Sequence, residues 1–381
     1  MKTVIIGGFV DYEIQMSRSL NKQNDSMVYI YTKDTCLLPE NEKLGEGLKI
    51  RLLSRPGAIY NPIVLAHFLV NSYRMLKEIR QYDPDVVHFQ IGSSMLAFYM
   101  PFLRKYPIVT TFHDLKPHSG EVTLWEKYLH RYIRRRSDYL LVHGDGLQET
   151  MIREYRQPAS KVRSIPIGPH NIDAFKFYEN KDLKEDGNMV LFFGRILEYK
   201  GLEYLIKAEP YITKEIPDAR IVIAGSGDQM DKYERLMVNK DRFEVYHRYI
   251  PYTEGAGLFQ RASVIVLPYV EASQSGVVST AYGFKKPVVV TNIGSIPEIV
   301  DEGITGLVVP ARDPEALAKA IVRLLKDERS RLQMGANAYK KLNTDLSWDR
   351  VVEKTMGVYR EAVNGHRKGK GRDINKDGLH S

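Results

Sequence analysis

The chain has 381 residues, which is long enough for two domains, or three, each with its own hydrophobic core. Its apolar fraction of 43% and charged fraction of 27% are ordinary for a soluble globular protein, and we find no apolar stretch of membrane-spanning length. The net charge of +8 indicates an anionic partner, and nucleic acid, acidic lipid and nucleotide sugar all qualify.

The first half alternates short apolar runs with helical patterns. The apolar runs are residues 4–6, 27–31, 50–53, 86–89, 108–112 and 139–142. This βαβ succession predicts a doubly wound, Rossmann-like domain over residues 1–177. Met1 and Lys2 lead directly into the first strand, so we expect no signal peptide. The single cysteine, Cys36, excludes an intramolecular disulfide and favours a reducing, cytoplasmic compartment.

A second α/β succession follows a polar interruption. Residues 178–188 are polar and unpatterned, and we interpret them as a linker. The second doubly wound domain is predicted over residues 189–346, with apolar runs at 189–193, 221–224, 264–267, 288–291 and 307–309. A helical pattern at residues 347–364 has room to pack back on the first domain. The basic residues 365–381 lack apolar periodicity, so we expect disorder there.

The strand at residues 189–193 delivers charge to the edge of the second sheet. It ends in Gly194 and Arg195, and Lys200 follows before the next helix. Open α/β sheets bind ligands beyond the carboxyl ends of their strands, where two fixed cations suit a pyrophosphate. The alternative is that both are solvated loop charges, and the further glycine turns of this half argue against it.

Two glycine-containing turns add backbone donors. Gly225 and Gly227 form a Gly-Ser-Gly turn after a predicted strand. Ser275, Gly276 and Val277 begin a predicted helix, and their N–H groups would form an anion-binding nest at its positive end. The second half therefore has the layout of a diphosphate pocket.

These motifs, in this order, resemble the group 1 (family 4) glycosyltransferases. The matching segments are residues 192–206, 224–228, 286–300, 305–310 and 313–317, with weaker similarity at 110–114 and 165–168. The resemblance implies the GT-B architecture, in which two Rossmann-like domains face each other across a cleft. It also implies retaining transfer of a sugar from a nucleoside diphosphate donor, held by the second domain, to an acceptor held by the first.

The resemblance implies roles for individual residues. Arg195 and Lys200 would stabilise the leaving diphosphate, and His113 would orient the sugar or the acceptor, with His118 and Glu121 as its neighbours. The alternative for His113 is a histidine whose ring is satisfied inside the protein. The resemblance favours a front-face substitution without a covalent intermediate, and it implies neither a metal ion nor another cofactor.

The paired-glutamate motif of the family is incomplete in this chain. Glu271 stands near its first acidic position, although other alignments put Ala272 or Ser273 there. The second acid, which resembles a ribose clamp in relatives, is absent, because its place falls on Thr280 or Ala281. Nucleotide binding would then rely more on backbone amides and hydroxyls, and Glu271 and Thr280 are the candidate donor-binding residues of this region.

Two further pairs of residues allow a structural as well as a functional interpretation. Gly8, in the Gly7-Gly8 turn after the first strand, would let the backbone approach a phosphate or a sugar, or would serve only as a tight turn. Ser295 and Glu298 match the family, but Ser-x-x-Glu is also a capping box, and we favour the box.

A basic helix is predicted at residues 124–136. At helical spacing one side gathers Leu124, Tyr128, Leu129, Tyr132 and Ile133, and the other gathers Lys127, Arg131, Arg134 and Arg135. Either the cations lie in water, or they meet an anionic membrane surface with help from the basic tail.

The expected function is thus that of a glycosyltransferase in polysaccharide or lipid-linked glycan synthesis. We expect it to be cytoplasmic, with peripheral attachment to the inner face of the membrane as the additional hypothesis. Its partners would be a nucleoside diphosphate sugar and a glycan or lipid-linked acceptor, and not nucleic acid. The alternatives are a nucleotide-sugar epimerase of the same fold and a sugar-nucleotide binder without catalysis.

Overall fold

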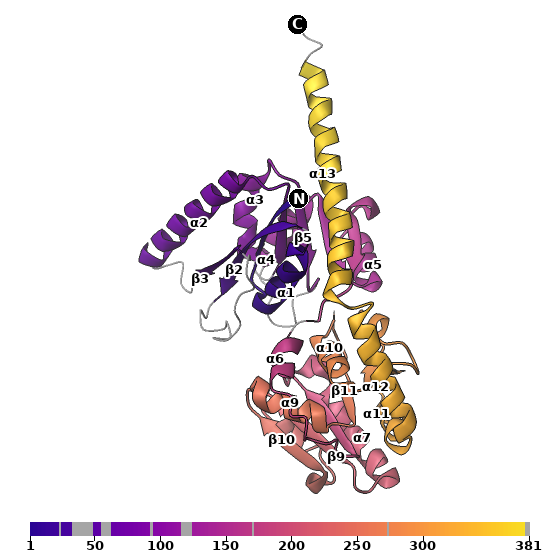
Figure 1. Cartoon of the computed structure of the whole chain (residues 1–381). Coiled ribbons are helices and arrows are strands. Elements are labelled where there is room, and N and C mark those ends of the chain that lie inside the picture. Colours follow the sequence, from indigo (N-terminus) through magenta and orange to yellow (C-terminus); the bar gives the residue numbers. More distant parts are fainter. Residues whose placement is uncertain are drawn as a thin grey trace. The chain divides into compact units, whose positions relative to one another are not determined.

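The computed structural model of the protein describes residues 1–22, 24–32, 49–54, 62–91, 94–115, 124–169, 171–272 and 274–377. The chain divides into two compact units (Figure 1). The first unit consists of Met1–Gly168 and Trp348–Ser381, and the second of Pro169–Ser347. Cys36, His118, Glu121 and Ser273 lie outside the described residues.

The described part of the first unit contains a seven-stranded parallel sheet in the order β3-β2-β1-β4-β5-β6-β7. Its strands are β1 (Lys2–Gly7), β2 (Asp25–Thr32), β3 (Lys49–Ser54), β4 (Val86–Ile91), β5 (Ile108–Phe112), β6 (Tyr139–His143) and β7 (Val162–Ile165). Its helices are α1 (Val10–Asn21), α2 (Pro62–Tyr82), α3 (Met100–Leu103), α4 (Leu124–Arg136), α5 (Asp145–Arg153) and α13 (Trp348–Asp377), with 3₁₀ turns η2 (Ser94–Tyr99) and η3 (Ala159–Lys161).

Both faces of this sheet are buried. In β1, Val4 and Ile6 belong to a core shared with α2, α4 and α5, whereas Ile5 belongs to a core shared with α1 and α13. Successive side chains of a strand point to opposite faces, so a strand covered by helices on both sides reads as a continuous apolar run. This is why the predicted strands of the first half were visible in the sequence.

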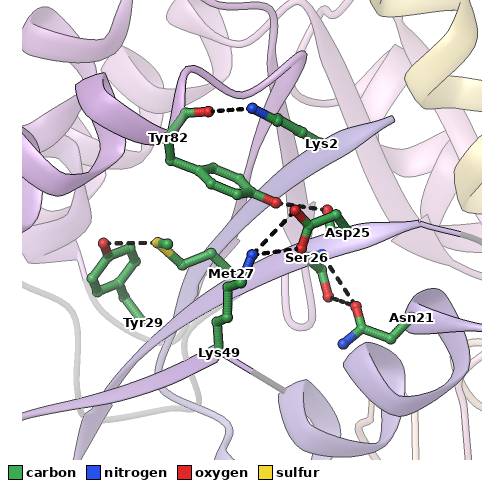
Figure 2. A network of polar contacts seen from close by, with 8 residues as sticks. All are labelled: Lys2, Asn21, Asp25, Ser26, Met27, Tyr29, Lys49 and Tyr82. Carbon is green, nitrogen blue, oxygen red and sulfur yellow. Dashed lines mark hydrogen bonds and ion pairs between the residues drawn. The ribbon is translucent and has the colours of Figure 1, made fainter. Parts of the chain in front are cut away.

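A polar network joins the amino ends of β1, β2 and β3 to the end of α2 (Figure 2). Lys2 Nζ donates to the carbonyl oxygen of Tyr82 at 3.1 Å, and the Tyr82 hydroxyl donates to the carbonyl oxygen of Asp25 at 2.9 Å. Lys49 Nζ lies 3.0 Å from an Asp25 carboxylate oxygen, and this hydrogen bond lowers the pKa of Asp25. These contacts are structural and lie at the sheet edge opposite the carboxyl ends.

The described part of the second unit contains a six-stranded parallel sheet in the order β10-β9-β8-β11-β12-β13. Its strands are β8 (Met189–Phe193), β9 (Arg220–Gly225), β10 (Phe243–His247), β11 (Val264–Leu267), β12 (Val288–Thr291) and β13 (Gly306–Val309). The chain order reverses between β8 and β11. In open α/β sheets such a reversal is where ligands bind, beyond the carboxyl ends of the strands.

Helices and 3₁₀ turns connect these strands. They are α6 (Ile172–Phe177), η4 (Glu198–Lys200), α7 (Leu202–Glu215), α8 (Asp231–Glu234), η5 (Lys240–Arg242), α9 (Tyr252–Arg261), α10 (Gly276–Gly283), η6 (Pro297–Ile299), α11 (Pro314–Lys326) and α12 (Glu328–Asn343). The prediction of two doubly wound α/β domains is confirmed.

The boundary between the units differs from the predicted one. We placed the end of the first domain at residue 177, but the division falls between Gly168 and Pro169, so α6 belongs to the second unit. The reason is packing. The Phe175 ring lies 4.9 Å from the Tyr252 ring and 5.5 Å from the Phe259 ring, measured between centroids.

Residues 178–188, interpreted as a linker, are tied into the second unit by ion pairs. Glu185 Oε2 accepts from Lys286 Nζ at 2.7 Å, and Glu185 Oε1 accepts from Arg331 Nη2 at 2.7 Å. Asp186 binds Arg261 at 2.8 Å. Lys286 and Arg331 are buried, so Glu185 is the shared counterion of two cations that have little access to water.

The C-terminal helix α13 packs on the first unit through its first turns. Val352 and Tyr359 are buried in the core shared with α1, and Asp349 accepts hydrogen bonds from Ser19 at 2.6 Å and Lys22 at 2.8 Å. We expected disorder from residue 365, but the helix continues to Asp377, and residues 378–381 lie outside the described part. A helix already nucleated by packing adds further turns at little cost.

Candidate functional site

The turns after β8 and β9 lie backbone against backbone. The N–H of Gly194 donates to the carbonyl oxygen of Ala224 at 2.9 Å. A Cβ atom on Gly225 would lie 1.7 Å from the carbonyl oxygen of Gly194, and one on Gly227 would lie 2.0 Å from that of Ile196. Gly225 and Gly227 are therefore needed for the two turns to approach. This role was not part of the prediction, which made them donor-binding residues.

The two predicted cations lie on the turn after β8, and each contacts a tyrosine. Arg195 is exposed, and its Nη2 donates to the hydroxyl of Tyr199 at 3.1 Å. Lys200 is partly buried, and its Nζ lies 3.7 Å from the centroid of the Tyr269 ring. A cation at this distance from an aromatic face is attracted by the ring quadrupole, which restrains the lysine.

The turn after β8 is held against the turn after β11. A Cβ atom on Gly201 would lie 2.0 Å from the carbonyl oxygen of Pro268, and the φ of Gly201 is +64°, in the left-handed region that favours glycine. The N–H of Val270 donates to the carbonyl oxygen of Tyr199 at 2.9 Å. These contacts bring Lys200 beside Tyr269 at the point where the strand order reverses.

Helix α10 begins next to these turns. Ser275 is its N-cap, with Oγ 3.2 Å from the hydroxyl of Tyr269 and 3.4 Å from the N–H of Val277. A Cβ atom on Gly194 would lie 3.9 Å from Val277 Cγ2, so the start of α10 is close to the end of β8. One of the three amides predicted to bind an anion, that of Val277, is thus engaged by the cap. The helix still presents its positive end here.

The two residues at the positions of the glutamate motif lie in different surroundings. Glu271 is exposed, and its N–H lies 3.3 Å from the carbonyl oxygen of Tyr199. The Thr280 side chain is buried, and its hydroxyl donates to the carbonyl oxygen of Gly276 at 3.2 Å. The hydroxyl of Thr280 is therefore used inside α10, which does not favour its prediction as a ribose ligand.

In the first unit, the Gly7-Gly8 turn encloses a buried carboxyl group. A Cβ atom on Gly7 would lie 1.7 Å from Glu13 Oε1, which accepts from the N–H of Phe9 at 3.0 Å. Burial raises the pKa of Glu13 to about 8. Gly8 is exposed. Gly7 thus has a packing role, and Gly8 is the glycine of the pair that is open to a ligand.

His113 follows β5 and is buried. Its Nε2 lies 2.7 Å from Gln90 Oε1, and its Nδ1 lies 3.2 Å from His143 Nε2. Its ring centroid lies 4.3 Å from that of Phe9 and 4.8 Å from that of Tyr12. His113 and the glycine turn therefore meet at the carboxyl edge of the first sheet. Both ring nitrogens have protein partners, which agrees with the alternative that His113 is a histidine whose ring is satisfied inside the protein.

Sequence reasoning missed several residues that hold the predicted ones. Tyr269 was not singled out, and neither were Glu13, Gln90 and His143. A signal was available for the last two, because each is a polar residue near the carboxyl end of a mostly apolar strand. Polar groups buried in such a position need partners, which predicts a network.

The prediction of a capping box at Ser295 and Glu298 is wrong. Residue Ile296 is the N-cap of the short turn η6, which has no side-chain cap. Within the described part of the chain, the buried Ser295 Oγ has no hydrogen-bond partner. The N–H of Glu298 donates instead to the backbone carbonyl of Ser295 at 3.3 Å, because the turn is 3₁₀ rather than α-helical.

Helix α4 shows a different distribution of side chains from the predicted one. Ile133 is buried and Leu129 packs on the core, but Tyr128 is exposed. Arg134 is buried, and its guanidinium carbon lies 4.4 Å from the centroid of the Tyr155 ring. Arg134 therefore does not belong to the exposed cationic side. Among the described residues, no helix is long and apolar enough to cross a bilayer.

Comparison with known proteins gives the family. Residues 187–327 match the family model described as glycosyl transferases group 1, and residues 6–169 match that of glycosyltransferase family 4. An uncharacterised glycosyltransferase of Methanocaldococcus jannaschii is 31% identical over 251 residues, which are 62% of this chain. The match spans only 63% of the length of that relative.

Further similarities cover more of the chain. The alpha-D-kanosaminyltransferase of Streptomyces kanamyceticus is 27% identical over 76% of this chain and 80% of its own length. HepE of Anabaena, solved in complex with UDP-glucose, has the same fold with a TM-score of 0.71 at 13% identity, over 95% of this chain and 100% of that one. With matches in both units, this chain belongs to the group 1 (family 4) glycosyltransferases and has the GT-B fold.

Proposed function

We propose that this protein is a retaining glycosyltransferase that moves a sugar from a nucleoside diphosphate sugar to an acceptor hydroxyl, without a metal ion at the leaving group. One observation carries the proposal. The ring of Tyr269 contacts Lys200 with its face, and its hydroxyl contacts Ser275 at the start of α10. A cation and a positive helix end are thereby held together at the switch point of the sheet.

The chemistry supported by this arrangement is stabilisation of the leaving group. When the bond between the sugar and the diphosphate breaks, the electron pair stays on the phosphate oxygen and negative charge increases there. Preorganised cations and N–H groups aimed at that oxygen lower the barrier. We assign this role to Arg195 and Lys200, with the amides of Ser275 and Gly276 in support.

Two parts of the proposal rest on the resemblance to the family. These are the retention of the anomeric configuration of the sugar and the participation of His113. A front-face substitution would proceed through an oxocarbenium-like state. The acceptor oxygen would attack the same face of the sugar from which the diphosphate departs. We propose that His113 helps to place the sugar or the acceptor. Because Gln90 and His143 occupy its ring nitrogens, this role would come from the fixed position of the turn after β5.

We further propose that the nucleotide is held without help from the second position of the glutamate motif. The Thr280 hydroxyl is bonded inside α10, so Glu271, Gly194 and the exposed backbone of the glycine turns are the remaining candidates. Because HepE binds UDP-glucose and has the same fold, uridine diphosphate sugars are the first donors to test.

The acceptor is proposed to be a glycan or a lipid-linked glycan reached at the inner face of a membrane. On α4, Trp125 is 66% exposed and Tyr128 is 61% exposed, and their rings are stacked at 5.9 Å. Exposed cations accompany them on the same helix, at Lys127, Arg131 and Arg135. Aromatic and basic side chains together suit the headgroup region of an anionic bilayer.

A donor panel tests the proposed function. Titration calorimetry with UDP-, GDP- and ADP-sugars should show saturable binding to the protein, and binding of the preferred donor should weaken in Lys200→Ala. Product analysis by NMR should then show transfer with the anomeric configuration of the donor, and turnover should persist in excess chelator. Formation of an epimer without acceptor would support the epimerase alternative. Binding without turnover on any acceptor would support the non-catalytic one.

A further inference from the structure

A continuous run of buried polar groups follows the face of the first sheet that α1 and α13 cover. It begins at Tyr359 on α13 and passes through His88 and Gln90 on β4. It continues through His113, which follows β5, and His143, the last residue of β6. It ends at the carbonyl oxygen of Pro166. The successive distances are 2.6 Å, 3.4 Å, 2.7 Å, 3.2 Å and 3.3 Å. All five side chains are buried.

The end of this run determines the direction of its hydrogen bonds. The carbonyl oxygen of Pro166 can only accept, so His143 Nδ1 must carry a proton. In a neutral ring, His143 Nε2 then has a lone pair and accepts. His113 Nδ1, at 3.2 Å from it, must therefore donate. A neutral His113 is left with a lone pair on Nε2.

Gln90 faces that lone pair and has two possible orientations. With Oε1 towards His113 Nε2, two acceptors meet unless His113 carries a second proton and a charge. With the amide turned over, its NH₂ group donates to His113 and its carbonyl accepts from His88. The two orientations occupy the same volume, and only the hydrogen bonds distinguish them. Turning the amide gives up its contact of 3.4 Å to the weak acceptor Met16 Sδ.

The neutral arrangement agrees with the rest of the run. Burial lowers the pKa of His88 to about 3, so this ring is neutral at physiological pH. The single N–H of His88 Nε2 is then shared between Thr111 Oγ1, which lies at 2.7 Å, and Gln90, whose amide lies at 3.4 Å. His88 Nδ1 can accept from the hydroxyl of Tyr359. A charged His113 would instead have to be desolvated in the same interior.

We propose that Gln90 and His143 are positioning residues that hold His113 as the neutral tautomer with its proton on Nδ1. All hydrogen bonds then run in one direction, from Tyr359 to Pro166. This arrangement holds the His113 ring in one plane against Phe9 and Tyr12, and so links the turn after β5 to the glycine turn. The consequence for turnover rests on the proposed function, but the tautomer does not.

NMR of the full chain labelled with ¹⁵N in its histidine rings tests the tautomer directly. The His113 signals are identified by their loss in His113→Gln. We expect Nδ1 of His113 to show the shift of a protonated nitrogen and Nε2 that of a nitrogen with a lone pair. A proton on Nε2 alone, or protons on both nitrogens at neutral pH, would overturn the proposal.

Two substitutions of His143 separate positioning from packing. His143→Phe keeps an aromatic ring but removes the acceptor, so the His113 proton should move to Nε2. His143→Gln keeps an acceptor for His113 and a donor for Pro166, so the proton should stay on Nδ1. His67→Gln, at an exposed position of α2, is the control and should change neither signal. An identical His113 tautomer in the wild type and His143→Phe would contradict the role of His143.

Turnover provides a separate readout. His143→Phe should lower kcat by roughly tenfold with a smaller change in KM, and His143→Gln should restore most of it. Unchanged kcat in His143→Phe would refute the link between tautomer and reaction. If the wild type transfers no sugar while His113 shows the expected tautomer, the proposed function fails and the hydrogen-bond order stands.

Discussion

The ammonium nitrogen of Lys200 lies 3.7 Å from the centroid of the Tyr269 ring. The same tyrosine is buried, and its hydroxyl lies 3.2 Å from Ser275 Oγ. A flexible lysine side chain is thus held in place beside the positive end of α10. Preorganisation of this kind is what leaving-group stabilisation requires, because no group has to reorient as the charge develops.

Removal of the Lys200 ammonium group should therefore reduce the rate rather than the stability. We expect Lys200→Ala to lower kcat by about 10²-fold, comparable with the loss of one preorganised donor, while the circular dichroism spectrum stays the same. Steady-state kinetics measures it. Lys207→Ala is the matched control, because Lys207 is exposed on α7, where it lies 3.0 Å from Glu203 and over the ring of Tyr204. Wild-type turnover in Lys200→Ala would refute the clamp.

Substitution of Tyr269 should separate the effect of its ring from that of its hydroxyl. Tyr269→Leu removes the cation–π contact, which contributes on the order of 1 kcal/mol, so we expect kcat to fall roughly fivefold. Tyr269→Phe keeps the aromatic face under Lys200 and loses only the contact with Ser275, so its kcat should stay closer to that of the wild type. Equal kcat values for the two variants would show that the ring does not act through Lys200.

Neutralising Glu185 should destabilise the second unit. In Glu185→Gln the buried cations of Lys286 and Arg331 lose their shared partner, and such a loss costs about 3–5 kcal/mol. Urea unfolding followed by a probe in the second unit measures the change. Glu179→Gln, in the same segment, breaks a more exposed pair with Lys176 and should cost less than about 1 kcal/mol. Similar losses in both variants would contradict the special role of Glu185.

The buried Glu13 should make stability depend on pH. Burial raises its pKa from 4.5 to about 8, so the folded protein holds a proton that the unfolded chain releases above pH 4.5. Glu13 therefore costs stability that grows from about pH 4.5 to about pH 8 and is constant above that. Glu13→Gln keeps an acceptor for the N–H of Phe9 and removes this cost.

As the pH rises through this window, the unfolding free energy of Glu13→Gln should thus increase relative to that of the wild type. Denaturant titrations at several pH values measure it. Glu149→Gln is the control, because Glu149 pairs with Arg153 on the exposed surface of α5. A difference that does not change with pH would mean that Glu13 is not protonated in the folded protein.

Binding to anionic vesicles should depend on the exposed cations of α4. Replacing Lys127, Arg131 and Arg135 by glutamine should weaken co-sedimentation with acidic liposomes by about 10²-fold, since each of the three basic residues near the surface contributes about 1 kcal/mol. Arg134 is left unchanged because it is buried against Tyr155. Binding should also decrease with salt.

The paired variant Arg153→Gln and Arg156→Gln changes two cations outside α4 and serves as the control. Equal weakening in this variant would indicate a general effect of net charge. A wild-type protein that does not bind acidic liposomes even at low salt would remove the membrane proposal and favour a soluble acceptor.

The amino-acid sequence by itself determined the two α/β units. Strands covered on both faces are continuous apolar runs, and the glycine turns at their ends can be recognised without any knowledge of long-range contacts. The strands β7 and β10 were not predicted. The sequence of β7, VRSI, and that of β10, FEVYH, mix polar and apolar residues, because several side chains of these two strands are only partly buried.

The tertiary structure alone decided which groups become partners. Lys200 and Tyr269 meet because β8 and β11 are neighbours in the sheet, although 68 residues lie between them in the sequence. Gln90, His113 and His143 meet because β4, β5 and β6 are adjacent. Local patterns report burial and turn geometry, whereas hydrogen bonds and ion pairs between distant segments depend on strand order and register. A single sequence does not carry that information in any local pattern.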